Sequence, residues 1–167
     1  MRISKINAAF FGVLLLLLPL AVFAAEPAPN FKLPTFKSEI NLSSYRGRVV
    51  YVDFWASWCE PCRKSFPWMD EIQARYGKDL KVIAINLDQE RADAVGFLKK
   101  LNPKFTIAFD PAGKVAEVYQ VKGMPSSYLI DQRGRIVASH IGFRSSDKEK
   151  LESHIQKLLA KQQASTR

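Results

Sequence analysis

The strongest constraint on the fold is a seven-residue apolar run, Val49–Trp55, which is followed after a short loop by an amphipathic segment, Glu60–Tyr76. The run reads VVYVDFW, and an unbroken series of β-branched and aromatic residues predicts a strand that is buried on both faces. In the second segment, apolar residues recur at spacings of three and four and the pattern stops at Gly77, which predicts a helix. A buried strand that leads directly into a helix is typical of a sheet covered on both sides.

The rest of the chain continues this alternation. Residues 26–47 predict an extended, proline-rich lead-in, a short hairpin and a turn. Further strands and helices follow from the apolar periodicity, with strands expected over 80–88, 105–110 and on either side of a turn at 132–134, and helices over 92–101, 114–119 and 146–161. We therefore predict an α/β fold with a central mixed β-sheet flanked by helices on both faces, and 167 residues fit one such domain.

Residues 1–24 differ from the rest of the chain in composition. Arg2 and Lys5 precede an apolar stretch that lacks acidic residues, contains five consecutive leucines and ends in small residues. This pattern is typical of a secretory signal peptide and predicts cleavage after Ala24, or after Ala25 as the alternative, so that residues 25–167 form the exported domain. An uncleaved membrane anchor is the other interpretation, because the apolar stretch of 18 residues is at the short end of what spans a bilayer.

The formal net charge of the chain is +9, and removal of residues 1–24 would lower it by two, to +7. A basic surface can attract anionic lipid or nucleic acid. The lysines and arginines are nevertheless mixed with acidic residues, and they form no basic stripe interleaved with aromatic residues. We interpret them as solvated surface charge and expect no nucleic-acid partner.

Cys59 and Cys62, the only cysteines, lie where the first predicted strand gives way to the first predicted helix. Cys59 would then stand at the helix N-terminus, where unpaired N–H groups and the helix dipole stabilise a thiolate. Cys62 would lie one turn inside the helix, shielded and suited to attack a mixed disulfide formed by Cys59. Pro61 is compatible with this position because the first helical turn needs no N–H group from it.

Two other interpretations of the cysteine pair are less consistent with the sequence. A zinc site would need two further ligands, and the only histidines, His140 and His154, fall on a predicted strand and the terminal helix without the usual spacing. A purely structural disulfide that closes so short a loop would constrain the unfolded chain little. We therefore predict a redox couple and expect neither a metal nor another cofactor.

The sequence around the cysteines, VDFWASWCEPCRKSFP, resembles the active site of the thioredoxin superfamily, and specifically its exported TlpA/ResA-like thiol-disulfide oxidoreductases. The segments APNFKLP, LSSYRGRVV, GMPSSYLID and GRIV resemble the same family in order and spacing. The resemblance implies a thioredoxin-like fold with an N-terminal hairpin and a central αβ insertion. It also implies protein thiols and disulfides as substrates and a membrane thiol-electron carrier as the source of reductant, and we expect a periplasmic monomer.

The resemblance implies roles for individual residues. Cys59 would be the attacking thiolate and Cys62 the resolving cysteine. Trp58 would pack beside the disulfide, with an aromatic residue at the edge of the core as the alternative. Met124 and Pro125 would form a cis-proline loop that faces the cysteines and pairs with an extended substrate peptide, with an ordinary trans proline as the alternative.

Asp53 is the one charged residue in the first predicted strand. A carboxyl group buried on both faces is costly unless it is hydrogen-bonded or protonated, and such a cost often marks a functional site. The matching position in thioredoxin is also Asp, so the resemblance implies that Asp53 acts as general acid and base for Cys62, with a capped structural carboxylate as the alternative. Glu60 and Pro61, inside the motif, are interpreted as tuning the redox properties of the pair.

Two positions depart from the family pattern. Ser65 stands where reductases dedicated to apocytochrome c typically carry Glu, and Ala84 replaces the lysine that pairs with the buried Asp of thioredoxin. The predicted function is an exported thiol-disulfide oxidoreductase that reduces protein disulfides. The alternatives are a disulfide-forming oxidase, an apocytochrome c thiol reductase, a non-catalytic binding module, and a peroxidase, against which Ala56 stands where peroxiredoxins carry Thr.

Overall fold

The computed structural model describes residues 25–165, so the predicted signal peptide lies outside the described residues. The strands are β1 (Lys32–Pro34), β2 (Glu39–Asn41), β3 (Val49–Trp55), β4 (Leu80–Asn86), β5 (Thr106–Phe109), β6 (Ser126–Ile130) and β7 (Ile136–Ile141). The helices are α1 (Glu60–Tyr76), α2 (Arg91–Leu101), α3 (Lys114–Val118) and α4 (Lys148–Ser165), with short 3-10 helices η1 (Leu42–Tyr45) and η2 (Ser145–Asp147).

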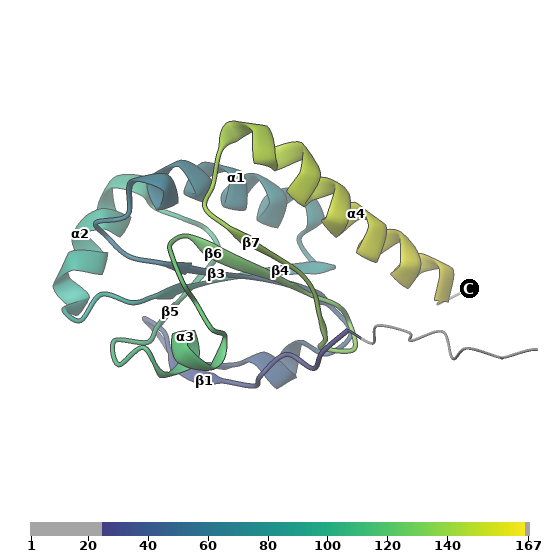
Figure 1. Cartoon of the computed structure of the whole chain (residues 1–167), viewed down its shortest axis with the longest axis horizontal. Coiled ribbons are helices and arrows are strands. Elements are labelled where there is room, and N and C mark those ends of the chain that lie inside the picture. The colour runs from purple at the N-terminus through teal and green to yellow at the C-terminus, as the bar shows by residue number, and fades with distance from the viewer. Residues whose placement is uncertain (1–24, 166–167) are drawn as a thin grey trace, which may run out of the picture.

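The main sheet has five strands in the order β5-β4-β3-β6-β7, and β1 and β2 form a separate hairpin (Figure 1). β3 pairs in parallel with β4 and antiparallel with β6. Every residue of β3 is buried, as expected for a central strand with both faces covered. The predicted mixed sheet is therefore confirmed, and β3 delivers its carboxyl end to the first turn of α1.

The two faces of the sheet carry separate apolar cores. On one side, α1, α2 and α4 cover Tyr51 and Trp55 of β3, and on the other the hairpin, η1 and α3 cover Val52 and Phe54 (Figure 1). The alternation of these residues follows from the two-residue period of a strand. Helices on both faces, the N-terminal hairpin and the added α2 and β5 segment agree with the predicted thioredoxin-like fold.

The terminal helix differs most from its predicted bounds. η2 precedes it because the Asp147 carboxylate accepts the backbone N–H of Arg144 at 2.8 Å, so α4 begins only at Lys148. α4 is held against α1 through Glu152, which accepts hydrogen bonds from Arg75 and, at 2.7 Å, from the Tyr76 hydroxyl. Within residues 25–165, none of the helices combines the length and apolar character needed to cross a bilayer.

Candidate active site

The two cysteines lie at the start of α1, as the sequence predicts. Cys59 is the N-cap residue of α1, and its Sγ accepts the backbone N–H of Cys62 at 3.2 Å. The structure describes the oxidised pair, a Cys59–Cys62 disulfide with Cα atoms 5.3 Å apart. Both residues are buried, and Cys62 is completely enclosed. After reduction, a thiolate at Cys59 would therefore be stabilised by helix N–H groups, whereas Cys62 would lie behind it.

A carboxylate anchors the loop that precedes Cys59. The backbone N–H of Ser57 donates to both oxygens of Asp88, at 3.1 and 3.0 Å, and the Ser57 hydroxyl donates to Oδ1 at 3.0 Å. Asn86 donates its side-chain amide to Oδ2 at 2.8 Å. Sequence reasoning missed this role, because Asp88 only marked the end of a predicted strand. The strand in fact ends at Asn86, and the chain then turns Asp88 towards the loop.

Replacement of Asp88 by alanine is expected to lower the free energy of unfolding by about 1–3 kcal/mol, because buried donors lose their acceptor. Urea unfolding of the oxidised protein measures this loss. Glu71→Ala is the matched control, since Glu71 is an exposed acidic residue of α1 and its loss should cost less than about 0.5 kcal/mol. Equal losses in the two variants would contradict the anchoring role.

Asp53 lies on the face of β3 that α1 covers. Its residue is 1 % exposed, and Oδ2 has no hydrogen-bond partner among the described residues. Burial raises the pKa of Asp53 well above its ordinary value, so the carboxyl group is readily protonated. Ala84 is its neighbour on β4, which confirms that no lysine stands at that strand position. The sheet therefore holds a buried, readily protonated carboxyl group on the face that α1 covers, and its role in proton exchange with Cys62 remains a prediction.

A second loop approaches the cysteines from the start of β6. The Met124–Pro125 peptide bond is cis, and Met124 packs against the apolar core that includes both cysteines. The carbonyl oxygen of Pro125 accepts the N–H of Gly142 at 2.7 Å, which joins this loop to the end of β7. The conformation agrees with the resemblance, and a role in substrate binding remains a prediction.

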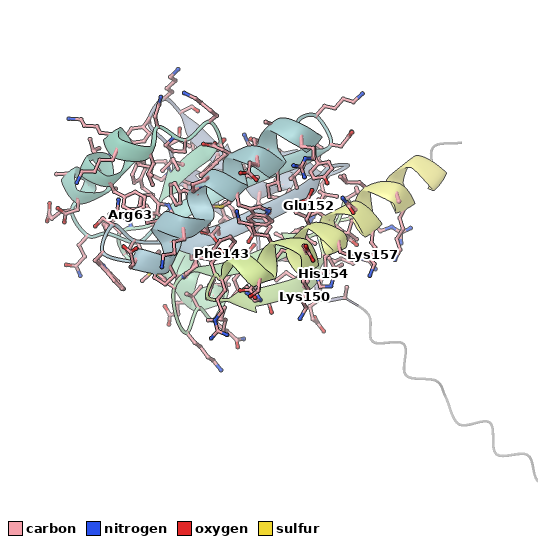
Figure 2. The ribbon with its side chains drawn as sticks, turned by 90° about the horizontal axis from the view of Figure 1, so that it is seen from above. Arg63, Phe143, Lys150, Glu152, His154 and Lys157 are labelled. Atoms are coloured by element: carbon pink, nitrogen blue, oxygen red, sulfur yellow. A yellow bond between two sulfur atoms is a disulfide. The ribbon has the colours of Figure 1, made fainter. Side chains whose placement is uncertain are left out.

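The residues flanking the cysteines are exposed. Trp58 is 73 % exposed, so most of its ring faces solvent, and its role beside the disulfide remains a prediction. Glu60 Oε2 lies 3.6 Å from Arg63 Nε, in the first turn of α1 (Figure 2). The Arg63 guanidinium lies over the Phe97 ring, 4.7 Å from its centroid. The surface around the disulfide thus combines an accessible aromatic ring with a compensated pair of charges.

Among residues 25–165, no group of three or more His, Cys, Asp or Glu side chains is placed to hold a metal ion. His140 on β7 and His154 on α4 line a common cavity. The two cysteines are instead joined to each other in a disulfide. The arrangement can perform thiol-disulfide exchange, with Cys59 at the N-terminus of α1 and Cys62 completely enclosed behind it.

Comparisons with known proteins agree with this chemistry. A family model described as Redoxin matches residues 23–155. Thiol-disulfide oxidoreductase ResA of Bacillus cereus (strain ZK / E33L) is 35 % identical over 135 residues, which cover 80 % of this chain and 77 % of the relative. ResA of Bacillus subtilis (strain 168) is 32 % identical over 126 residues, or 70 % of each protein.

The solved structures give the same result. A candidate thiol:disulfide interchange protein DsbE from Chlorobium tepidum is 50 % identical, with a TM-score of 0.79 over 81 % of this chain and 96 % of that chain. The exposed lipoprotein thioredoxin Etrx1 of Streptococcus pneumoniae is 34 % identical with a TM-score of 0.70, over 78 % of this chain and all of that one.

Proposed function

The chain belongs to the redoxin family as a TlpA/ResA-like thiol-disulfide oxidoreductase, and we propose that it reduces the disulfides of proteins outside the cytoplasm. The observation that carries this proposal is the position of Cys59 at the N-cap of α1, with Cys62 enclosed behind it. A stabilised outer thiolate favours attack on a substrate disulfide, and a shielded inner thiol can act only on the bond that this attack forms.

The proposed reaction proceeds in two exchanges. The Cys59 thiolate attacks one sulfur of the substrate disulfide, so that a mixed disulfide forms and the other substrate sulfur leaves as a thiolate. Cys62 then transfers its proton to the Asp53 carboxylate and attacks the Cys59 sulfur, which releases the second substrate thiolate. Two electrons pass to the substrate, and the chain is left with the Cys59–Cys62 disulfide and a protonated Asp53.

The elevated pKa of Asp53 suits this role. A general base is most effective when its pKa lies near the working pH, and burial raises the pKa of Asp53 in that direction. Glu60 and Pro61, both exposed in the first turn of α1, are proposed to tune the stability of the Cys59 thiolate relative to the disulfide.

Substrate peptides are proposed to dock at Trp58 and along the loop of Met124 and Pro125. Trp58→Ala is expected to raise KM for a disulfide-bonded peptide by roughly three- to tenfold, since a buried aromatic contact contributes about 1 kcal/mol or more. The rate at saturation and the reduction potential should not change. Val137→Ala is the control, because Val137 is an exposed apolar residue of β7, five positions from Gly142, which bonds to Pro125. A lower saturating rate with an unchanged KM would contradict docking at Trp58.

The cellular setting proposed for this reaction is extracytoplasmic. The composition of residues 1–24 supports export by a cleaved signal peptide, and an uncleaved leader would leave the same domain anchored at the membrane. Reductant would reach the domain from a membrane thiol-electron carrier. The proposal is tested by mixing the reduced protein with a disulfide-bonded peptide and counting the thiols formed: one substrate disulfide should be reduced for each protein oxidised, and no consumption of peptide would refute it.

A further inference from the structure

A cavity of about 100 Å³ lies between α4 and the strands β6 and β7. Its polar lining comes from Tyr51, Ser127, Ser139, His140, Lys150 and His154. Figure 2 shows Lys150 and His154 together on α4, on the side away from Glu152 and α1. One water molecule needs about 10–15 Å³ of such space and several polar partners, so the cavity can hold a short chain of waters.

The strand register aligns three polar residues that lead to this cavity. Asp53 of β3 pairs with Ser127 of β6, and Ser127 pairs with His140 of β7. Residues directly opposite each other on neighbouring strands share one face, with Cβ atoms about 4.5–5.5 Å apart. Exposure rises along the row, from 1 % for Asp53 to 4 % for Ser127 and 26 % for the His140 side chain. The row therefore runs from the middle of the sheet to its edge.

The opposite direction along the same row is apolar. Asp53 pairs with Ala84 on β4, and Ala84 pairs with Ile107 on β5. Tyr51 flanks the polar side: burial and the nearby Asp53 raise its pKa, and a hydrogen bond with Ser127 acts in the other direction. The Tyr51 hydroxyl thus lies near the Asp53 carboxyl group and is hydrogen-bonded to Ser127. Across the sheet, polar groups continue from Asp53 only towards β6 and β7.

We propose that Asp53 exchanges its proton with solvent through the Ser127 hydroxyl and the cavity beneath α4, with His140 as a proton acceptor at the outer end. This inference rests on the proposed function. In the mixed disulfide the substrate covers the Cys59 side of the site, so the proton that Cys62 gives to Asp53 needs another exit. Asp53 passes it to Ser127, Ser127 releases its own proton to water in the cavity, and that water transfers a proton to His140 or to bulk solvent.

The charged groups around the outer end are consistent with this route. His140 Nε2 lies 3.2 Å from Asp147 Oδ2, which orients the ring. The backbone N–H of Arg144 and then the side chain of His140 hold the pKa of Asp147 below its ordinary value, so Asp147 stays ionised at neutral pH. From α4, Lys150 and His154 face the same cavity. A proton that arrives at this end therefore meets a carboxylate, two imidazoles and open solvent.

The test measures single-turnover resolution of a mixed disulfide by Cys62 in H₂O and in D₂O. Ser127→Ala and His140→Ala are each expected to slow resolution roughly three- to tenfold, a part of the 10²–10⁴-fold that proton transfer contributes. The solvent isotope effect should increase, and added imidazole should restore His140→Ala. His140→Gln, which keeps a hydrogen-bond donor towards Asp147, should remain slow. Ser153→Ala on α4, a serine outside the cavity lining, should match the unmodified protein.

The same substitutions in an Asp53→Asn background decide between proton transfer and packing. If the route serves Asp53, Ser127→Ala and His140→Ala should cause no further slowing there. Equal slowing in both backgrounds, or no slowing in either, would overturn the inference. Failure of the proposed function is a separate outcome. It is recognised when the unmodified protein leaves the peptide disulfide intact, and the inference would then fail as well.

Discussion

Cys59→Ser is expected to lower the rate of disulfide reduction by at least about 10³-fold, because a serine hydroxyl is not ionised at neutral pH and is a poor nucleophile. Cys62→Ser should behave differently. The thiolate of Cys59 would still attack, but no sulfur would lie behind it at the N-terminus of α1 to resolve the product. A mixed disulfide with the substrate peptide should therefore accumulate.

Rapid-mixing kinetics measure the first effect, and mass spectrometry of the intact adduct measures the second. Equal urea unfolding midpoints for each variant and the reduced unmodified protein serve as the control for folding. A stable adduct on Cys59→Ser, formed through Cys62, would reverse the assigned roles. Unchanged binding of a partner by the Cys59→Ser, Cys62→Ser double variant, without any turnover by the unmodified protein, would instead indicate a binding module.

Asp53→Asn is the second substitution with a large expected effect, and it should slow resolution by Cys62 roughly 10²-fold at neutral pH. In the unmodified protein the resolution rate should rise with pH as Asp53 ionises. This ionisation occurs at higher pH than for an ordinary carboxyl group, because burial raises the pKa of Asp53. The variant should show no such rise. Stopped-flow measurements over a pH series compare the two proteins, and parallel profiles would contradict the role of Asp53.

Asp53→Asn should also stabilise the oxidised protein, by about 1–3 kcal/mol at high pH, because the amide cannot ionise and so avoids the cost of a buried, unpaired carboxylate. The folded protein holds a proton on Asp53 more tightly than the unfolded chain does. The stability of the unmodified protein should therefore be greatest below the pKa that Asp53 has in the unfolded chain. It should fall as pH rises towards the higher pKa of Asp53 in the folded protein, so the benefit of Asn should grow over that range. Urea unfolding over a pH series measures the benefit, which should be absent at low pH.

Asp131→Asn is the matched control for both measurements. Burial alone would raise the pKa of Asp131, but hydrogen bonds and charge from Arg135 outweigh this and lower it. Its contribution to stability is therefore present above the unfolded pKa and is lost as pH falls. Asp131→Asn should destabilise the protein at neutral pH and leave the resolution rate unchanged. The two buried acids thus predict opposite effects of the same substitution.

The sequence predicts those parts of the fold that depend on local patterns. The bounds of β3 and α1 match the prediction, because a continuous apolar run defines the strand and the three-and-four spacing before Gly77 defines the helix. The position of Cys59 at the helix N-terminus follows from those two elements. The cis bond before Pro125 has no local signal, and its expectation depended on resemblance to a family.

The unpredicted parts of the site depend on contacts between distant segments. Asp88 holds Ser57 across 31 positions of sequence, and no periodicity encodes that contact. The alignment of Asp53, Ser127 and His140 requires the register of three strands, which an apolar pattern leaves undetermined. The later start of α4 has a local cause instead, because the Asp147 carboxylate accepts the N–H of Arg144 and a 3-10 turn forms first.

The direction of electron flow is the central claim, and the equilibrium reduction potential of the Cys59–Cys62 couple tests it most directly. The protein would be equilibrated with thiol buffers of graded potential, and the fraction of free thiol would be measured by alkylation. We predict a value of about −270 mV or lower, as for thioredoxin, which makes the dithiol an electron donor. A value near about −120 mV would contradict the account, because the disulfide would then be the reactive form and the protein an oxidant.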